Sequence, residues 1–402
     1  MNIKRILLCE LLAAALLLAT AACAEATQGG DIVVPKLDNP YVCDIPDNDA
    51  MAFLRQMGVG WNLGNTLDAY RDWAGGDEMS IEAAWCGVLT TEDMIEAVRA
   101  AGFSTLRVPV SWHNHVDADF NISAPWLDRV QQVVDWGIAR DMTVILDIHH
   151  DEYPEYYYPS EACYAQSERY IRRIWEQLAA RFGDYGEKLI FEAMNEPRQK
   201  GTDWEWWLDE ENAQCREAAD CINRLTPVFV DTVRATGGNN AGRYLMVPGY
   251  DAAPRGALSE LFVLPKDSAD NRIIVSVHAY TPYSFALQED GVDSFTTVAG
   301  QQTSEIGTFM NSLYEKYISK GVPVVIGEFG ARDKDGNTQA RVDYAAYYTF
   351  SARNRGIPCC WWDNNYFAGD GERFGLLNRA DCSWPYPEIV EALVTYGGAR
   401  QP

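Results

Sequence analysis

Two glutamates that lie far apart in the chain each end an apolar, strand-like run. Glu196 stands in FEAMNEPR (residues 191–198), directly after Asn195 and before a proline, and Glu328 ends the run that begins at Val324. A carboxylate at the end of a buried strand is costly unless it has partners or a task. Two carboxyl groups that face each other across a cleft are what glycoside hydrolysis requires, and their separation decides between retention and inversion of configuration. Glu196 and Glu328 are therefore the candidate catalytic pair.

Further polar side chains gather at the ends of other strand-like runs. They are Asn65 and Asp68 after the first run, Arg107 in the second, His149, His150 and Asp151 after the third, Asn195 at the fourth, His278 and Tyr280 at the sixth, and Trp362, Asp363 and Asn364 at the eighth. Taken singly, an arginine here is more often a salt-bridge partner, and a histidine more often packs in the core. Three of the five histidines of the chain nevertheless fall at these ends, which favours one shared site.

The side chains around the two glutamates suit the same chemistry. Arg107 is permanently charged and fork-shaped, so we expect it to hold Glu328 ionised and oriented. Asn195 can bind a sugar 2-hydroxyl, and His278 and Tyr280 can tune the two carboxyl groups. Trp362 offers a flat apolar face on which a sugar ring can stack.

Aromatic residues are frequent in the predicted loops of this chain. It has 13 Trp and 21 Tyr, and those in loops include Trp61, Trp73, Trp112, Tyr153, Trp204, Trp206, Trp207, Tyr283 and Tyr366. Core packing accounts for some of them, since Trp is buried on average. The run DWEWW (residues 203–207) is too interleaved with polar residues to lie wholly in a core. We expect some of these rings, Trp112 among them, to line a cleft that binds sugar.

The elements that must position these residues alternate along the chain. Eight strands are predicted at Val59–Leu63, Thr105–Pro109, Thr143–Ile148, Leu189–Met194, Tyr244–Val247, Ile273–His278, Val324–Glu328 and Cys359–Trp362. Helical patterns lie between them at residues 92–101, 125–140, 167–182, 215–235, 256–264, 305–320, 341–355 and 386–396, the fifth being the weakest. Strands that alternate with helices eight times predict an α/β fold, a single (β/α)8 barrel whose active site lies at the C-terminal ends of the strands.

The N-terminus is typical of an export signal. Lys4 and Arg5 precede an apolar run, Leu11–Ala19, and small residues surround Cys23. The run is too short to span a bilayer, which needs roughly 20 residues. We expect a signal peptide at 1–23, of ordinary or lipoprotein type, a tether at 24–46 and one catalytic domain at 47–402. The protein would then be exported and lie outside the cell, in a periplasm, or lipid-anchored at a bacterial cell surface.

The net charge of -25 argues against partners that are polyanions. Nucleic acids and anionic membrane surfaces would repel such a chain, whereas a neutral polysaccharide would not. We expect a monomer with no transmembrane segment. Eight cysteines follow the signal region, without zinc-ligand spacing, and Cys215 and Cys221 are poorly spaced for a disulfide within one helix. Buried thiols, with at most one bridge, are expected.

Eight ordered motifs resemble glycoside hydrolase family 5, and most of all its subfamily 4 of endo-β-1,4-glucanases and xyloglucanases. They are MGVGWNLGNTLDA, LRVPVSWHNHV, VILDIHHD, IFEAMNEPR, YLMVPGY, VSVHAYTPYSF, VVIGEFGA and WWDNN. The resemblance covers about Gly58 to Asn378 and implies a (β/α)8 fold and retaining hydrolysis without a metal or other cofactor. By motif it makes Glu196 the acid/base and Glu328 the nucleophile.

The resemblance also implies roles for other residues of this chain. The active-centre positions of the family match Arg107, His149, Asn195, His278, Tyr280 and Trp362, and positions that usually line the glycone subsites match Asn65, Asp68 and His150. Asn364 and Trp112 complete the expected substrate-binding set. The chain departs from the subfamily at Cys86-Gly87-Val88 and at His113 and His115, which puts the preferred substrate in question rather than the chemistry.

Two rival hypotheses use the same residues. A metal-dependent barrel hydrolase would use His149, His150, Asp151 and His278, but such sites usually have an H-x-H on the first strand, where this chain has asparagines. A glycan-binding protein without catalysis is favoured only when a catalytic glutamate is replaced, and both are present. The sequence therefore predicts an exported retaining endo-β-1,4-glucanase. Cellulose, mixed-linkage glucan, xyloglucan, glucomannan and xylan all remain open as substrates.

The stretch FEAMNEPR makes one structural prediction of its own. Successive residues of a strand point to opposite faces, so Asn195 and Glu196 can both reach the cleft only if the strand is irregular at its end. We predict such an irregularity, with Glu196 facing Glu328. Glu192 is expected to be structural, facing the outer layer or a salt bridge.

Overall fold

The computed structural model describes residues 31–38, 42–72 and 75–398. Contacts group the chain from Val34 onward into one compact unit, and every element below belongs to it. The predicted signal peptide, much of the predicted tether and Trp73 lie outside the described residues. No helix within the described ranges combines the length and the apolar character that crossing a membrane requires.

Eight parallel strands close into a barrel in chain order. They are β1 (Gly60–Leu63), β2 (Thr105–Val108), β3 (Thr143–Asp147), β4 (Leu189–Glu192), β5 (Leu245–Pro248), β6 (Ile273–His278), β7 (Val324–Phe329) and β8 (Cys359–Asp363). Closure comes from pairing of β1 with β8, in which Gly60 faces Cys360 and Asn62 faces Trp362. Every strand residue is buried, because the helices cover the outside and side chains fill the inside. The predicted (β/α)8 barrel is confirmed.

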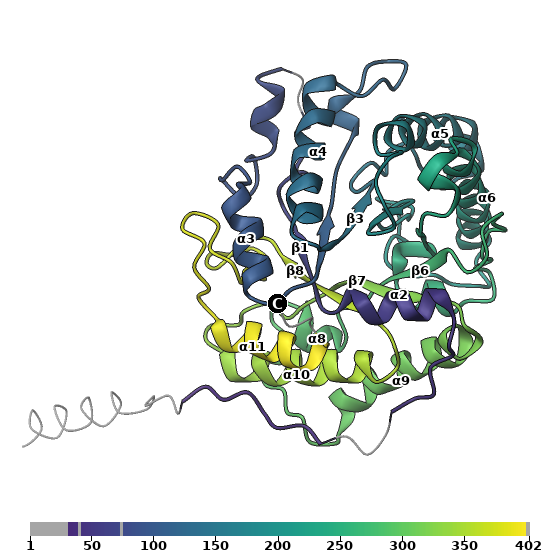
Figure 1. Cartoon of the computed structure of the whole chain (residues 1–402). Coiled ribbons are helices and arrows are strands. Elements are labelled where there is room, and N and C mark those ends of the chain that lie inside the picture. The colour runs from purple at the N-terminus through teal and green to yellow at the C-terminus, as the bar shows by residue number, and fades with distance from the viewer. Residues whose placement is uncertain (1–30, 39–41, 73–74, 399–402) are drawn as a thin grey trace, which may run out of the picture. The chain divides into compact units, whose positions relative to one another are not determined.

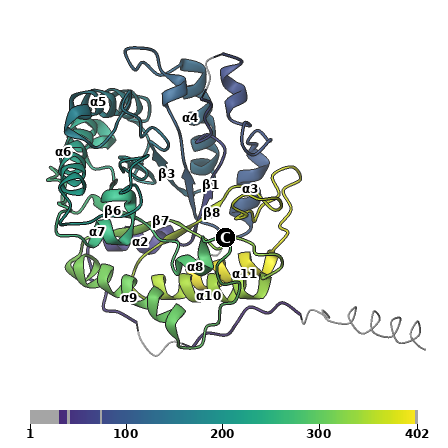
Figure 2. The ribbon, with the colours of Figure 1, turned by 180° about the vertical axis from the view of Figure 1, so that it is seen from behind.

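Helices surround the barrel (Figures 1 and 2). They are α2 (Asp49–Met57), α3 (Glu92–Ala100), α4 (Ala124–Ala139), α5 (Tyr164–Arg181), α6 (Ala213–Ala235), α7 (Pro254–Leu258), α8 (Tyr283–Ala286), α9 (Gln301–Lys316), α10 (Thr338–Arg353) and α11 (Pro387–Gly397). Short 3-10 turns are η1 (Glu78–Ile81), η2 (His113–His115), η3 (Glu161–Cys163), η4 (Gly238–Ala241), η5 (Tyr250–Ala252) and η6 (Ile318–Lys320). The weakest predicted helix, 256–264, is replaced by the five-residue α7.

Local sequence explains where several helices begin. Thr91 caps α3 by accepting a hydrogen bond from the Met94 N–H, and Asn212 caps α6 in the same way. The α2 helix was not predicted from the periodicity. Asn48 caps it, accepting from the Met51 N–H at 2.8 Å, and its Nδ2 donates to the carbonyl of Gly321 near the start of β7.

The end of β4 is irregular, as predicted. Ala193 N–H donates to Met246 O on β5, so in a regular strand Asn195 N–H would donate to the same neighbour. It instead donates to Ile148 O, which follows β3, at 2.8 Å. This switch of partner within two residues breaks the regular repeat of the ladder, as a β-bulge does. At this irregularity, called the β4 bulge below, Asn195 contacts Arg107 and Glu196 contacts His278.

Candidate active site

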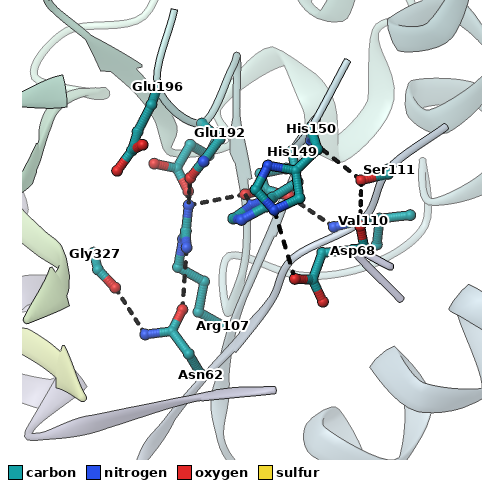
Figure 3. Close-up of polar contacts among 12 residues, drawn as sticks. Asn62, Asp68, Arg107, Val110, Ser111, His149, His150, Glu192, Glu196 and Gly327 are labelled. Atoms are coloured by element: carbon teal, nitrogen blue, oxygen red, sulfur yellow. Dashed lines mark hydrogen bonds and ion pairs between the residues drawn. The ribbon is translucent and has the colours of Figure 1, made fainter. Parts of the chain in front are cut away.

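Arg107 organises the bottom of the site with five hydrogen bonds, one for each of its N–H groups. Nε donates to Glu192 at 2.7 Å, Nη1 to Asn62 and Glu328, and Nη2 to Asp147 and Asn195. The side chain is completely buried, and in Figure 3 it lies between Asn62 and Glu192. A guanidinium with every donor used and three carboxylates around it has a single stable orientation. The predicted contact of Arg107 with Glu328 is 2.6 Å long.

The two candidate catalytic glutamates meet at His278. Its Nδ1 lies 2.9 Å from Glu196 Oε1 and 3.7 Å from Glu328 Oε1. One oxygen of each carboxyl group lies within 4.8 Å of the other. The ring fits because position 327 is glycine: a Cβ there would stand 3.0 Å from His278 Nε2. Glu196 comes from the bulged end of β4 and Glu328 from β7, so the barrel brings together groups 132 positions apart in the sequence.

The two carboxyl groups have different partners. Glu328 accepts from Arg107 and, at 2.9 Å, from the hydroxyl of Tyr280. Glu196 is bonded to His278 and has Arg198 at 3.5 Å. It is also the more open of the two, with 16% of its side chain exposed against 6% for Glu328. The two donors to Glu328 keep their protons near neutral pH, since Arg107 stays charged and Tyr280 stays neutral. The main partner of Glu196 is His278, which can gain or lose a proton.

Burial and neighbouring charges shift the pKa values of His278, Glu196 and Glu328. Burial lowers the pKa of His278, but the charge of Glu328 and the contacts with Glu192 and Glu196 outweigh it and raise that pKa to about 10. Burial raises the pKa of Glu196, but the hydrogen bond and charge of His278 outweigh it and hold that pKa below its usual range. Burial also raises the pKa of Glu328, against the charges of His278 and Arg107. The raised pKa of His278 and the lowered pKa of Glu196 favour a protonated imidazole facing an ionised Glu196 across 2.9 Å.

Residues predicted to line the glycone side lie beside this centre. His150 Nε2 is 3.9 Å from Asp68 Oδ2, and the ring of His150 meets that of His149 edge-on. Asp68 is buried and accepts the N–H groups of Asn65 and Thr66, which holds Asn65 in a left-handed conformation with φ of 57°. Burial raises the pKa of Asp68 to about 7. Asp68 thus shapes the loop after β1, and Asn65 and His150 beside it are both half-buried.

The end of β8 contributes Trp362, whose ring packs against His149. Trp362 is stacked parallel to His149, with 5.7 Å between the ring centres and 2° between their planes, and it keeps 7% exposure. His149 Nδ1 is bonded to Asp147 at 2.8 Å, which fixes its orientation. Asn364 is buried, and both ends of its amide bond to the loop that follows, through Glu372 O and Tyr366 N. Its observed contacts therefore position that loop.

The structure places Trp112 differently from the prediction. The indole is 0% exposed and its Nε1 donates to the carbonyl of Asp147 below the site, so it offers no face to a sugar. Trp61 is equally buried, with its Nε1 bonded to Asp363. Of the aromatic residues expected in loops, Trp206, Trp207 and Tyr366 are exposed on loops, and the exposed Tyr283 begins helix α8.

Both departures from the subfamily pattern at 113 and 115 are packed histidines. His113 Nδ1 bonds to Asp151, which also accepts the Tyr170 hydroxyl. His115 is stacked on Trp126 with 3.6 Å between ring centres. Asp151 is thereby engaged away from His149, His150 and His278, so the four ligands of the rival metal hypothesis do not form one group among the described residues.

Three important acidic or basic residues were not predicted as part of the site. Asp147 and Glu192 are buried inside strands, and both form salt bridges with Arg107. Of the two alternatives stated for Glu192, an outward orientation or a salt bridge, the structure shows the salt bridge, and it lies inside the barrel. Arg198, at the end of the NEPR stretch, is 5% exposed and touches Glu196. The available signal was charge inside otherwise apolar strands: two buried acids require a buried base.

Seven cysteines of the described ranges are free thiols: Cys86, Cys163, Cys215, Cys221, Cys359, Cys360 and Cys382.

Comparison with known proteins supports one family. Residues 67–368 match the family model described as cellulase, glycosyl hydrolase family 5. Endoglucanase 1 of Ruminococcus albus is 41% identical over 368 residues, which cover 89% of this chain and 86% of that protein. Endoglucanase A of Clostridium longisporum is 39% identical over 86% of this chain and 65% of its own length.

Solved structures resemble the whole barrel. A family 5 lichenase from Caldicellulosiruptor sp. F32 superposes with a TM-score of 0.89 at 54% identity, covering 91% of this chain and 99% of its own. A subfamily 4 broad-specificity endoglucanase from Ruminococcus champanellensis, solved with bound cellotriose, has a TM-score of 0.80 at 42% identity, covering 88% and 100%.

Proposed function

The chain belongs to glycoside hydrolase family 5, and we propose that it is a retaining endo-β-1,4-glucanase in which Glu196 is the acid/base and Glu328 the nucleophile. The observation that carries the mechanism is the distance between these carboxyl groups. One oxygen of each lies within 4.8 Å of the other. Inverting enzymes need about 6.5–9.5 Å to admit a water between the carboxyls, whereas about 5–5.5 Å suits a covalent intermediate.

The first step breaks the glycosidic bond. A Glu328 carboxylate oxygen attacks the anomeric carbon while Glu196 gives its proton to the departing aglycone oxygen. Glu328 has Arg107 and Tyr280 to keep it ionised and aimed. Glu196 draws on the proton that it shares with His278 across 2.9 Å. General acid assistance of this kind contributes roughly 10² to 10⁴ in rate.

The second step hydrolyses the glycosyl–enzyme ester. Glu196, now ionised, takes a proton from a water molecule, whose oxygen attacks the anomeric carbon and displaces Glu328 as a carboxylate. Two inversions at one carbon give net retention. In this proposal Asn195, whose Oδ1 accepts from Arg107 Nη2 at 2.7 Å, binds the sugar 2-hydroxyl during both steps.

The substrate class that we propose is β-1,4-linked glucan. The solved relatives include a lichenase, a variant of that lichenase in complex with cellotetraose, and broad-specificity endoglucanases. Trp362, parallel to His149, supplies a flat wall for a pyranose ring. Mixed-linkage glucan is the first alternative, because the lichenase is 54% identical to this chain. A reducing-sugar assay on cellulose, mixed-linkage glucan, xyloglucan, glucomannan and xylan ranks these substrates.

The test of the acid/base assignment is Glu196→Ala with 2,4-dinitrophenyl β-cellobioside. This leaving group departs without a proton, so the glycosyl–enzyme forms and then accumulates for lack of a base. Azide should restore turnover and yield β-cellobiosyl azide, identified by NMR. Absence of both rescue and product would remove Glu196 from its proposed role. Glu328→Ala is the matched variant, and azide should give it no β-configured product.

We also propose that the chain is exported. The argument is the charged start, the apolar run and the small residues around Cys23. Mass spectrometry of the mature N-terminus distinguishes an ordinary cleavage from a lipid-modified Cys23, and an uncleaved Met1 would contradict export by this signal.

A further inference from the structure

Arg198 stands directly behind the acid/base carboxyl and has no part in the chemistry described so far. Its Nη1 donates to the backbone carbonyl of Glu196 at 3.0 Å and lies 3.5 Å from Glu196 Oε2. One guanidinium nitrogen thus touches both ends of the same residue. Because Glu196 lies just after the β4 bulge, where the ladder is interrupted, its backbone needs support from a side chain.

Arg198 is held in turn by two further carboxylates and a ring. Glu152, in the loop after β3, lies 3.6 Å from the same Nη1, and Glu205, in the loop after β4, lies 3.3 Å from Nε. The guanidinium carbon is 4.1 Å from the ring centre of Trp206, which is 60% exposed. Arg198 therefore connects Glu196 to the exposed loop on its side of the cleft.

Glu152 competes with Glu196 for this one cation. Glu152 is 1% exposed, and its Oε1 accepts the Tyr157 hydroxyl, while its Oε2 has no hydrogen-bond partner among the described residues. A buried carboxylate in this state depends on the nearby guanidinium. An ionised Glu152 offsets part of the attraction of Arg198 for Glu196, which lies 3.5 Å from the same nitrogen.

We propose that Arg198, shared between Glu152 and Glu196, is a positioning residue for the acid/base of the proposed glucanase reaction. It orients the Glu196 carboxyl towards the leaving oxygen and favours its ionised form, which the second step needs. The inference rests on the proposed function, since it assigns to Arg198 a role only through Glu196.

Other titratable groups also face this pair and set the background against which Arg198 acts. From the β3 side they are His149, His150, Glu152 and Tyr157. From β5 to β8 they are Asp251, His278, Tyr280, Glu328 and Glu372, and Glu205 faces Arg198 from its own loop. None of these changes in the variants below, apart from Glu152 itself.

The first test is the dependence on the leaving group. Arg198→Gln should lower kcat/KM on cellotetraose by about 30-fold, part of the general acid contribution. On 2,4-dinitrophenyl β-cellobioside, whose departure needs no proton, the loss in kcat/KM should stay within about threefold. Damage to the fold in general would lower both alike. Arg255→Gln is the matched control: Arg255 stacks on the neighbouring Trp207 at 4.0 Å and bonds Leu208 O, without touching Glu196.

The second test is the direction of a pH shift. The alkaline limb of kcat/KM reports loss of the proton shared by Glu196 and His278. Removing the positive charge in Arg198→Gln should move this limb up by about one pH unit, since a cation within 4–6 Å favours the ionised carboxyl. Glu152→Gln removes the negative charge that competes with Glu196 for Arg198, so it should move the alkaline limb to lower pH. Arg198→Lys, which keeps the charge, should return the limb towards the wild type, and Arg255→Gln should leave it in place.

These outcomes separate the two proposals. The role of Arg198 is overturned if Arg198→Gln loses kcat/KM equally on both substrates. It is also overturned if the alkaline limb stays in place in both Arg198→Gln and Glu152→Gln. Either result counts even where azide still rescues Glu196→Ala. Failure of azide rescue overturns the acid/base assignment first. If Arg198→Gln folds poorly because Glu152 loses its partner, the double variant R198Q/E152Q removes both charges and keeps the leaving-group test usable.

Discussion

The floor of the site and its rim are built in opposite ways. The floor consists of Asn62, Arg107, Asp147, Glu192 and Asn195, all buried and joined by hydrogen bonds to the one guanidinium. Outside it lie exposed aromatic residues, which we call the rim: Trp206, Trp207 and Tyr366 on loops and Tyr283 at the start of α8, with 37% to 61% exposure. The floor holds charged groups in fixed positions, while the rim exposes aromatic rings to solvent, where a polysaccharide can contact them.

This difference separates chemistry from substrate choice. A buried network in which each donor has an acceptor holds one geometry, because any rearrangement leaves a charge unpaired in a medium of low dielectric constant. An exposed ring on a loop can change its side-chain conformation at little cost. Relatives with the same barrel can therefore share one mechanism and differ in the polysaccharide they cleave.

Glu192→Gln is the strongest way to test the rigidity of the floor. It removes one carboxylate from Arg107 and leaves the guanidinium underpaired, so we expect about 3 kcal/mol of lost stability in urea unfolding. Glu260→Gln is the matched control, since Glu260 is 92% exposed and 3.7 Å from Lys316. That exposed pair should be worth less than about 1 kcal/mol. Comparable losses in both variants would mean that the floor is no more constrained than the surface.

Asp68→Asn tests a buried acid that forms no ion pair with a Lys or Arg of the described ranges and pairs there with His150 alone, at 3.9 Å. Folding raises the pKa of Asp68 from 3.8 to about 7 because the group is buried. Unfolded chains then bind fewer protons than folded ones between these values, so wild-type stability falls as pH rises through this window. Relative to wild type, the variant should gain about 2 kcal/mol between pH 5 and pH 7.

Urea titrations of both proteins at the two pH values measure this gain. Asp77→Asn is the control, because Asp77 also accepts a backbone N–H, from Met79, but remains exposed. Its difference from wild type should be the same at both pH values. A pH-independent difference for Asp68→Asn would contradict the raised pKa.

Trp206→Ala probes the rim and should have the smallest effect. Loss of an exposed stacking face should raise KM for a soluble glucan by up to about tenfold and leave kcat and the unfolding midpoint almost unchanged. Trp207→Ala removes the adjacent ring, which rests on Arg255 instead of Arg198, and should change KM less than twofold. A fall in kcat without a change in KM would place Trp206 with the floor.

The same division explains what the sequence could predict. Glu196, Glu328 and Arg107 were identifiable because strand ends converge at one side of a barrel. Glu192 was harder to place: both faces of a barrel strand are apolar, so alternation does not reveal which side is inside. Trp112 was assigned to the cleft and lies in the core, because composition does not distinguish a tryptophan that fills space from one that faces solvent. Arg198 contacts residues of two loops, those after β3 and β4, whose paths follow from tertiary packing alone.

The bulge at the end of β4 makes chain length as important to this site as residue identity. Deleting Ala193 or Met194 keeps every catalytic side chain and every strand, yet it would restore the regular alternation and turn the Glu196 position to the opposite face. A survey of point substitutions cannot detect such a requirement, because no single side chain carries it. For grafting or redesign, the unit to transfer is therefore the six-residue span from Ala193 to Arg198 with its spacing intact, together with the barrel edges that hold it.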